Sequence, residues 1–462
     1  MMRTPMTFQA FRTSHTAKLC KLSFLMLFLF LLPWQTRWIL HDVLIGDDVS
    51  QYGRLSVYLI DVVLMGYVTL AIATLKKGTV RSALKRPIFR TIAYASVGLS
   101  VWAYLSMIWS PSPLVALFGA LHLDLAMGFL LVALMDRGAS IGYLMSPLLL
   151  GMFVPGGLAW VQAAAQSIDA STILGIAAQD PTVLGTSVIE HSGGRWLRAY
   201  GSFPHPNILG GFSAVGLLLT FQMLAQRLGK SERIIGWLMT VVLSGALVLS
   251  ASRSAWLAFA LGMGLWCVGL FYLQDFARMV RLRFPIFIAG LTMFVLVLSI
   301  GPILTTRFDD DNRLESRSMT ERTAQLHETT QLLKNPYTLL GGVGMHSAVY
   351  ALAQRQPFLP AYEYQPVHNV LLLVVTELGL IGFALVVTIV IASDWRVHVH
   401  WKRPTSLMAM SFGLTLLVIA LFDHYLWSQV SGLYLLAVFL VMNTKCGQLS
   451  RSIDRQEKNA RA

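Results

Sequence analysis

Charged residues are scarce in this chain of 462 residues. Only 13% of its residues are Asp, Glu, Lys or Arg, whereas 55% are hydrophobic; soluble domains carry about 25% charged residues. Cysteine is rarer still, and the positions of Cys20, Cys267 and Cys446 fit neither a disulfide framework nor a zinc site. Gly229-Lys230-Ser231 is no phosphate-binding loop, because Leu224 stands where that motif needs glycine. These absences exclude an ordinary soluble domain, a disulfide-stapled domain and a P-loop protein.

Repeated apolar runs are present instead, each near the ~20 residues that a helix needs to cross a bilayer. They predict an all-α integral membrane protein, one polytopic domain over residues 1–462 with about twelve transmembrane helices. The first run, Leu22 to Trp34, follows basic residues and precedes no small-x-small cleavage site, which predicts an uncleaved anchor. The predicted spans are 19–40, 55–75, 91–109, 114–134, 140–165, 205–226, 234–251, 255–273, 284–303, 368–392, 405–422 and 429–443.

The basic residues predict the orientation of these spans. In a twelve-span arrangement every basic loop falls on the side of the N-terminus, and the positive-inside rule makes that side cytoplasmic for both termini. The net charge of +13 therefore indicates membrane topology, with the lipid bilayer and no nucleic acid as partner. The basic segments are 76–90, 227–233, 275–283, 394–404 and 445–461. The opposite, non-cytoplasmic side has loops 41–54, 166–204 and 304–367, and the last is a long loop predicted to contain short helices.

A polar motif, Arg198 to Asn207, stands at the mouth of an apolar run. Arginine, histidine and asparagine are costly there unless they face water or a polar ligand. Arg198 is thus a candidate site residue, although an interfacial arginine that extends its charge to water would look the same. Spacing does not choose between Arg195 and Arg198.

Arg322 lies in the long loop of residues 304–367. Ser318-Met-Thr-Glu321 fits a capping box and predicts a helix over Met319 to Leu333, which places Arg322 in the first turn. A cation is disfavoured there unless an anion binds the same helix start. The alternative is a solvated surface arginine.

His368 opens an apolar run, where a neutral imidazole could act as a general base. A hydrogen bond to loop backbone is the alternative. Polar groups within or beside the spans are weaker candidates, since packing roles are as common. They are Asp61, His122, Asp124 and Glu377, together with the acidic turn Asp309-Asp310-Asp311-Asn312, which is interpreted as hydrated and not as a metal site.

Four motifs in a fixed order carry a family resemblance. They are Arg198-x-x-Gly-Ser-Phe-Pro-His-Pro-Asn-Ile-Leu-Gly210, Leu249-Ser-Ala-Ser-Arg-Ser-Ala255, Thr320-Glu-Arg322 followed by Gly341-Gly-Val-Gly344, and His368-Asn369 with Glu377-Leu-Gly-Leu-Ile-Gly382. Over about 195–385, a core that includes loop 304–367, the chain resembles the O-antigen ligase/polymerase superfamily of bacterial membrane glycosyltransferases.

The resemblance implies a reaction at the periplasmic face of the inner membrane. Such enzymes transfer a glycan from undecaprenyl diphosphate to an acceptor hydroxyl, and the ligases need no metal or cofactor. By resemblance, Arg198 and Arg322 hold the diphosphate and His368 activates the acceptor. His205, Asn207 and Arg253 are further substrate-binding candidates, and Arg253 could instead support the fold. A base opposite the leaving group predicts inversion at the anomeric carbon.

The acceptor separates several interpretations. A ligase uses a lipid A–core sugar, a polymerase uses another lipid-linked repeat unit of O-antigen or exopolysaccharide, and a third branch uses protein hydroxyls. A polysaccharide transporter or flippase is an alternative from a different class. Transporters tend to place polar groups at the midplane and to contain internal repeats, whereas the candidates here gather at one face and no repeat is found.

Overall fold

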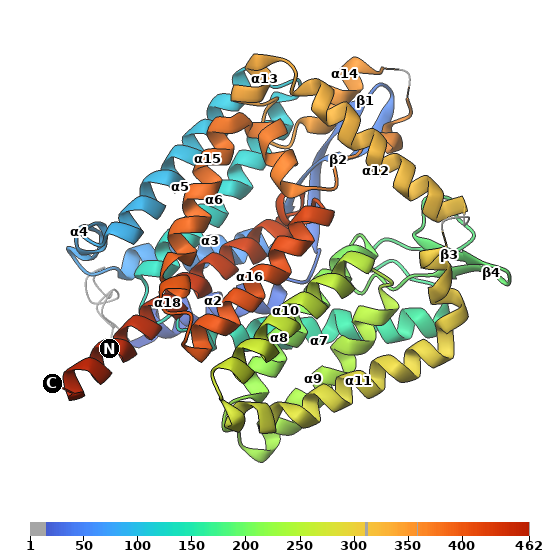
Figure 1. Cartoon of the computed structure of the whole chain (residues 1–462). Helices are drawn as coiled ribbons and strands as arrows, with labels where there is room; N and C mark the ends of the chain where they lie inside the picture. The colour runs from blue at the N-terminus through green and yellow to red at the C-terminus, as the bar shows by residue number, and fades with distance from the viewer. Residues whose placement is uncertain (1–14, 310–312, 358, 462) are drawn as a thin grey trace, which may run out of the picture.

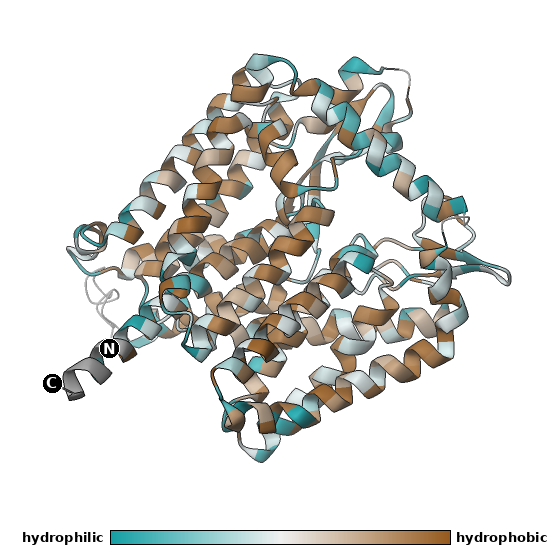
Figure 2. Cartoon of the chain, viewed as in Figure 1, coloured by the Kyte–Doolittle hydropathy of each residue, from teal (hydrophilic) through white to brown (hydrophobic). Residues whose placement is uncertain are grey.

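Long apolar helices make up most of the molecule (Figure 1). The structure, a computed structural model, describes residues 15–309, 313–357 and 359–461. Within these ranges ten helices are long and apolar enough to cross a membrane, and Figure 2 shows that hydrophobic residues dominate these helices. They are α5 (Pro87–Leu105), α6 (Pro113–Met135), α7 (Ile141–Ala165), α8 (Pro206–Leu224), α9 (Lys230–Leu249), α10 (Arg253–Tyr272), α11 (Phe276–Thr305), α15 (Val370–Val399), α16 (Pro404–Phe422) and α18 (Val430–Arg461).

Two shorter helices occupy the first two predicted spans. Helix α2 (His15–Leu31) and helix α3 (Leu59–Thr74) pack against each other, and α3 is apolar but shorter than the ten. The chain is thus a multi-pass membrane protein. The count of twelve spans stays a prediction, because α2 and α3 are shorter than the ten helices that are long enough to cross a membrane.

The predicted first span, 19–40, is wrong in its second half. Pro33 lacks the backbone N–H that would extend α2, and strand β1 (Arg37–Ile45) follows, paired antiparallel with β2 (Asp48–Tyr58). Hydropathy counted Trp38 and its neighbours as membrane-spanning, whereas Trp38 is exposed on the hairpin. A second hairpin joins β3 (Val188–His191) to β4 (Gly194–Leu197). The fold is therefore mainly but not entirely α-helical.

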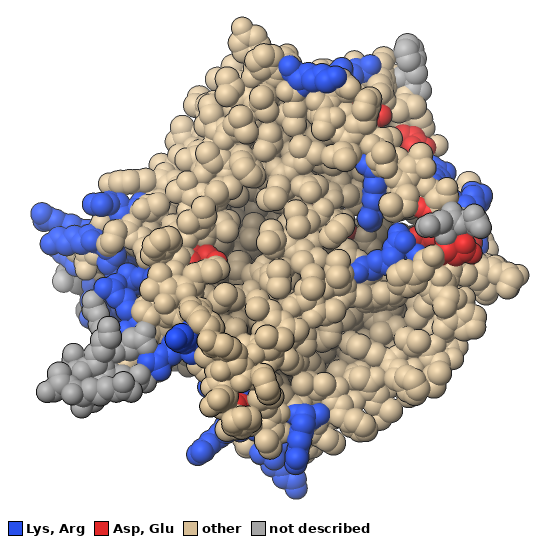
Figure 3. All heavy atoms as spheres, viewed as in Figure 1, with Lys and Arg blue, Asp and Glu red and all other residues tan. Residues whose placement is uncertain are grey.

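The helices define two sides of the molecule. The terminal side carries both chain ends, the short helix α4 (Thr79–Leu84) and the loops after α8 and α10, and Lys and Arg gather there (Figures 1 and 3). The loop side, opposite, carries both hairpins together with α12 (Arg313–Leu332), α13 (Pro336–Gly341) and α14 (Ala348–Arg355). All candidate residues of the polar motif and of the long loop lie on the loop side.

Helix α12 begins earlier than the capping box predicted. It starts at Arg313, so Ser318 lies inside the helix and caps nothing, and Arg322 lies in the helix interior. The helix dipole therefore does not disfavour the positive charge of Arg322, which is more than two turns from the helix start. The buried residues follow one another at intervals of ten, four and three positions, which places them along one inward side of the helix. They are Glu315, Gln325, Thr329 and Leu332.

The two glycine motifs hold the long loop to α15. The backbone N–H groups of Val343 and Gly344 donate to the carbonyls of Thr376 and Glu377 at 2.9 Å. Gly379 interrupts α15 with a φ of 67°, and a β-carbon there would collide with the carbonyl of Leu340. Only glycine permits this approach. The motifs thus fix the long loop next to the start of α15, where His368 lies.

Candidate active site

Four segments distant in sequence meet on the loop side. They are the turn before α8, the inward face of α12, the residues preceding α15, and the turn between α16 and α18 that contains α17 (Tyr425–Ser428). Figure 3 shows basic and acidic side chains gathered around α12 and β3, beside a hollow in the surface. The residues of these segments form a connected set of polar contacts.

Arg198 is buried and makes two side-chain hydrogen bonds to the protein. Its Nε donates to the carbonyl of Ser250 at 2.9 Å, and its Nη2 donates to Oδ1 of Asn207 at 2.7 Å. Burial lowers the pKa of Arg198 to about 9. The serine-rich motif before α10 thus supplies a backbone partner to the first motif. Arg198 therefore supplies a fixed positive charge on the protein side of the site, and its hydrogen bonds go to protein groups.

Asp423 lies at the centre of the set, and the sequence analysis did not include it. Its Oδ2 accepts from Nδ2 of Asn207 at 2.9 Å, and its Oδ1 accepts from the backbone N–H of His424 at 2.8 Å. Burial raises the pKa of Asp423, but the nearby histidines His424, His368 and His205 and the Asn207 hydrogen bond outweigh burial and lower it below its usual value. Asp423 is therefore an ionised, buried carboxylate.

His368 lies between α12 and this carboxylate. Its Nδ1 is 2.7 Å from Oε1 of Gln325, and its ring meets the ring of His424 edge to face at 5.0 Å. With an amide oxygen facing Nδ1, the neutral ring carries its proton there and its lone pair at Nε2. Burial lowers the pKa of His368 to about 4, with the charge of Asp423 opposing that shift. The ring is neutral at physiological pH and can accept a proton at Nε2.

Arg322 differs from the other arginines of the site. It is half-buried on α12, and among the described residues its guanidinium has no hydrogen-bond or ion-pair partner. Burial lowers its pKa, and the charge of Asp423 opposes that change. A desolvated guanidinium without a protein partner is well placed to bind an external anion.

Arg253 binds the protein itself. Its Nη2 is 3.0 Å from Oε2 of the buried Glu315, and its Nη1 donates to the carbonyl of Arg307 at 2.7 Å. Arg307 also pairs with Glu315. These contacts attach the start of α12 to the start of α10 and to the turn that follows α11. The geometry therefore favours the fold-supporting role for Arg253 over direct substrate binding.

His205 caps the start of α8. Its Nδ1 accepts from the backbone N–H of Asn207 at 3.1 Å, and its Nε2 is 3.1 Å from Oγ of Ser187. Burial lowers the pKa of His205 to about 3, so the ring is neutral. Arg195 lies on β4 and pairs with Glu190 at 4.0 Å, away from Asn207. Of the two neighbouring arginines, only Arg198 belongs to the polar set.

The weaker candidates have protein partners. Asp61 accepts from Tyr434 Oη at 2.7 Å and from the backbone N–H of Tyr58 at 2.8 Å. These contacts fit the alternative interpretation of Asp61, a role in packing. The remaining pairs are His122 with Asp61 at 3.2 Å, Asp124 with Tyr104 at 2.8 Å, and Glu377 with Trp427 at 2.8 Å. Positions 310–312 of the acidic turn lie outside the described residues.

A metal ion has one possible set of ligands in the part of the chain that is described. One ligand atom each from His368, Asp423 and His424 lies within 4.8 Å of the others. Nδ1 of His424 is 2.6 Å from Ser428 Oγ, so both histidines have only Nε2 free of protein contacts. The arrangement fits a proton-transfer group equally well, and the positive charge of Arg322, which lowers the pKa of both histidines, opposes a divalent cation here.

The residues missed from the sequence share one property: each lies in a short or polar segment without a motif. Asp423-His424 forms a two-residue turn between two apolar runs, and an acid beside a histidine at a span end is the signal that could have identified it. Gln325 and Glu315 are recognisable only once α12 has its true start, because the buried face then contains both.

Comparison with known families finds a match over part of the chain. Residues 238–387 match the O-antigen ligase family, a stretch that runs from α9 through the first half of α15. The resemblance to the O-antigen ligase/polymerase superfamily is thereby confirmed. The matched stretch contains Arg253, Arg322 and His368, while the Arg198 motif precedes it and Asp423 follows it. Comparison with curated proteins finds no match.

Proposed function

We propose that this protein transfers a glycan from undecaprenyl diphosphate to an acceptor sugar hydroxyl at the periplasmic face of the bacterial inner membrane, as O-antigen ligases do. The family match supports an O-antigen ligase/polymerase-type function. The observation that carries the proposal is the guanidinium of Arg322, half-buried and free of protein partners, next to the neutral imidazole of His368 and the carboxylate of Asp423.

The donor would bind through its diphosphate. Negative charge grows on the leaving diphosphate as the anomeric bond breaks, and a preorganised cation stabilises that charge more in the transition state than in the ground state. Arg322 is free to grip two phosphate oxygens. Arg198 would contribute its positive charge from the protein side of the site, because its Nε and Nη2 donate to Ser250 and Asn207.

The acceptor hydroxyl would lose its proton to His368. Nε2 is the basic nitrogen, since Nδ1 faces Gln325. The imidazolium formed in this step would be stabilised by the nearby carboxylate of Asp423. The acceptor oxygen attacks the anomeric carbon from the face opposite the diphosphate, so we expect inversion. These residues supply both the charge stabilisation and the base.

A deletion strain tests the proposal and separates ligase from polymerase. Lipopolysaccharide and undecaprenyl-linked glycans would be compared by gel and mass analysis in the deletion strain and after complementation. Long glycans retained on undecaprenyl diphosphate, with bare lipid A–core, indicate a ligase, which we favour. Single repeat units indicate a polymerase of O-antigen or exopolysaccharide. Unchanged glycan transfer, or flipping of lipid-linked glycan by the purified protein without a new glycosidic bond, would overturn the proposal.

A further inference from the structure

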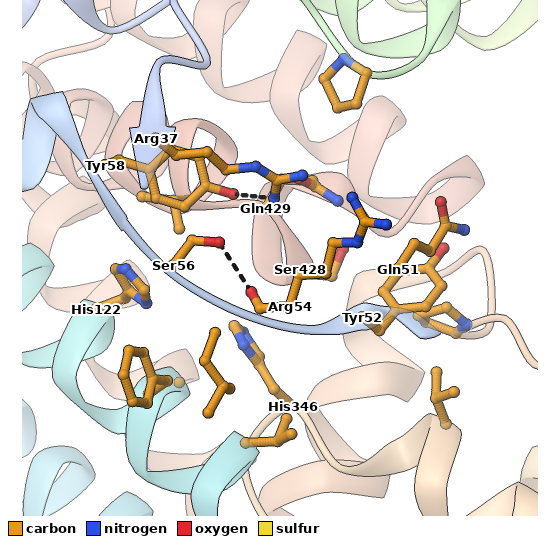
Figure 4. A pocket seen from close by; sticks show the side chains of 18 of the residues that line it. Arg37, Gln51, Tyr52, Arg54, Ser56, Tyr58, His122, His346, Ser428 and Gln429 are labelled. Carbon is orange, nitrogen blue, oxygen red and sulfur yellow. Dashed lines mark hydrogen bonds between the residues drawn. The ribbon is translucent and has the colours of Figure 1, made fainter. Parts of the chain in front are cut away.

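A cavity of about 140 Å³ lies beneath the β1–β2 hairpin, beside the site described above (Figure 4). Strand β2 crosses it, and residues from α6, from the loop before α14 and from the end of α17 complete its wall. Nothing in the proposed handling of the diphosphate uses this cavity. Its polar lining nevertheless belongs to the same side of the molecule as His368.

Two wall residues connect the cavity to the polar set through His424. The ring of Tyr52 lies 6.0 Å from the ring of His424, and Ser428 Oγ is 2.6 Å from Nδ1 of the same histidine. His424 in turn contacts His368. Pro204 and Pro366, each close in sequence to a site histidine, also line the cavity. A molecule bound here would therefore be separated from the base by a wall residue and His424.

The cavity is rich in cationic and hydrogen-bond-donating groups. Figure 4 shows Arg37 and Arg54 extending to the same side of β2 as Ser428 and Gln429. Arg37 donates to Tyr58 Oη at 3.1 Å and has no carboxylate partner among the described residues, while Arg54 makes only a loose pair with Asp42 at 3.7 Å.

One lining group is a buried donor without an acceptor. Nε2 of Gln35, on a residue that is 5% exposed, has no hydrogen-bond partner among the described residues. An unpaired buried donor is costly unless a ligand or water satisfies it. The one acidic lining residue, Glu377, is engaged by Trp427. The cavity thus offers two guanidiniums and an unpaired amide N–H, and its one carboxylate already has a partner. This lining favours the binding of an oxygen-rich anion.

We propose that this cavity is the acceptor subsite, and that it binds a sugar of the acceptor glycan that carries a carboxylate or phosphate group. This inference rests on the proposed transfer reaction, because it assigns the second substrate of that reaction. Arg37 and Arg54 hold the anionic substituent, and a free hydroxyl of the bound glycan reaches His368 past Tyr52 and His424. The donor diphosphate remains with Arg322, so the two substrates approach the base from different sides.

Binding of small glycolipids to the full-length purified protein tests this subsite without requiring turnover. The probes are octyl β-glucoside, octyl β-glucuronide and octyl glucoside 6-phosphate, and the readout is the dissociation constant from a ligand-detected NMR titration in a detergent without a sugar headgroup. We expect at least one anionic probe to bind about tenfold more tightly than the neutral one, which corresponds to one charge-assisted contact. The carboxylate and phosphate arms distinguish the two sources of the anion.

Matched variants connect the preference to the cavity. Arg37→Gln and Arg54→Gln should each reduce the preference for the anionic probe, while Arg54→Lys should retain part of it and Lys334→Gln, an exposed cation of the loop side, should leave it unchanged. Equal binding of all probes by the wild-type protein, or a preference that survives both Gln variants at normal thermal stability, would overturn the inference. Arg322→Lys should abolish transfer yet keep the preference, so failure of the acceptor subsite and failure of the transferase proposal give different results.

Discussion

Nδ2 of Asn207 donates to Oδ2 of Asp423 at 2.9 Å, across 216 positions of the chain. This bond joins the start of α8 to the turn after α16, and the other end of the same amide accepts from Arg198. One side chain therefore separates a buried cation from a buried anion and fixes both. The positions of Arg198 and Asp423 therefore depend on the uncharged side chain of Asn207 between them.

Replacing Asn207 should disturb both charges. In Asn207→Ala, Arg198 and Asp423 each lose a hydrogen bond while remaining buried, which costs ~1–3 kcal/mol for each unsatisfied group. We expect a lower apparent melting temperature of the purified protein together with reduced glycan transfer. Asn335→Ala is the matched control, because Asn335 caps only the short helix α13 on the same side. Unchanged stability and transfer in Asn207→Ala would show that the bridge is dispensable.

Arg322 should require its guanidinium. In Arg322→Lys a single ammonium replaces a fork that can hold two phosphate oxygens, and loss of one such transition-state contact typically costs ~100-fold or more in rate. Transfer from lipid-linked donor, at equal membrane abundance, is the measurement. Arg317→Lys on the same helix should be near wild type, since Arg317 is exposed and pairs with Glu321 at 2.6 Å. Near-normal transfer by Arg322→Lys would remove this residue from the mechanism.

The arginines and the histidine of the site illustrate what the sequence could and could not predict. Arg198, Arg322 and His368 were selected as polar groups beside apolar runs, and the fold brings their segments together on one side. Their division of labour was not predictable, because it depends on partners such as Ser250 and Gln325 that carry no motif. Whether an arginine is engaged or free is a property of the packed structure.

The secondary structure shows the same limit. Apolar runs predicted the long helices well, since a helix in lipid must satisfy its own backbone and leaves a clear hydropathy signal. The β1–β2 hairpin was missed because exposed Trp38, Ile39 and Leu40 extend an apolar run that hydropathy reads as membrane. The start of α12 was misplaced because a capping box is only four residues long and also occurs inside helices.

Glu315 should hold α12 in place. It is 4% exposed and pairs with both Arg253 and Arg307, and removing one partner of a buried ion pair costs ~3 kcal/mol because uncompensated charge remains. Glu315→Gln should therefore increase protease cleavage within α12 and reduce transfer. The control is Glu321→Gln, a partly exposed acid on the same helix that pairs with Arg317. Protease resistance equal to wild type in Glu315→Gln would mean that other contacts suffice to dock α12.

The pH dependence of transfer should follow a histidine with a lowered pKa. His368 is a base only when unprotonated, and its pKa lies at about 4, below the ordinary 6.5, chiefly because of burial. Lowering the pH from neutrality should thus leave the rate nearly constant through 6.5, and the rate should fall only as the pH approaches the lowered pKa. Gln325→Leu should reduce the rate at every pH, since the ring then loses the partner that places its lone pair at Nε2. A loss of activity centred near pH 6.5 in the wild type would contradict the buried, neutral base.

Removal of metal ions should leave the reaction intact. His368, Asp423 and His424 are close enough together to ligate an ion, but a bound cation would occupy the Nε2 that must accept the acceptor's proton and would repel Arg322. A catalytic metal contributes several kcal/mol, so stripping it would slow transfer ~100-fold or more. We expect the detergent-purified protein to keep its rate within about a factor of two after EDTA treatment and desalting. Asp423→Asn should be impaired before and after the same treatment, because its carboxylate acts on the imidazolium directly. A rate that collapses in EDTA and returns with a divalent cation would instead assign these three residues to a metal centre.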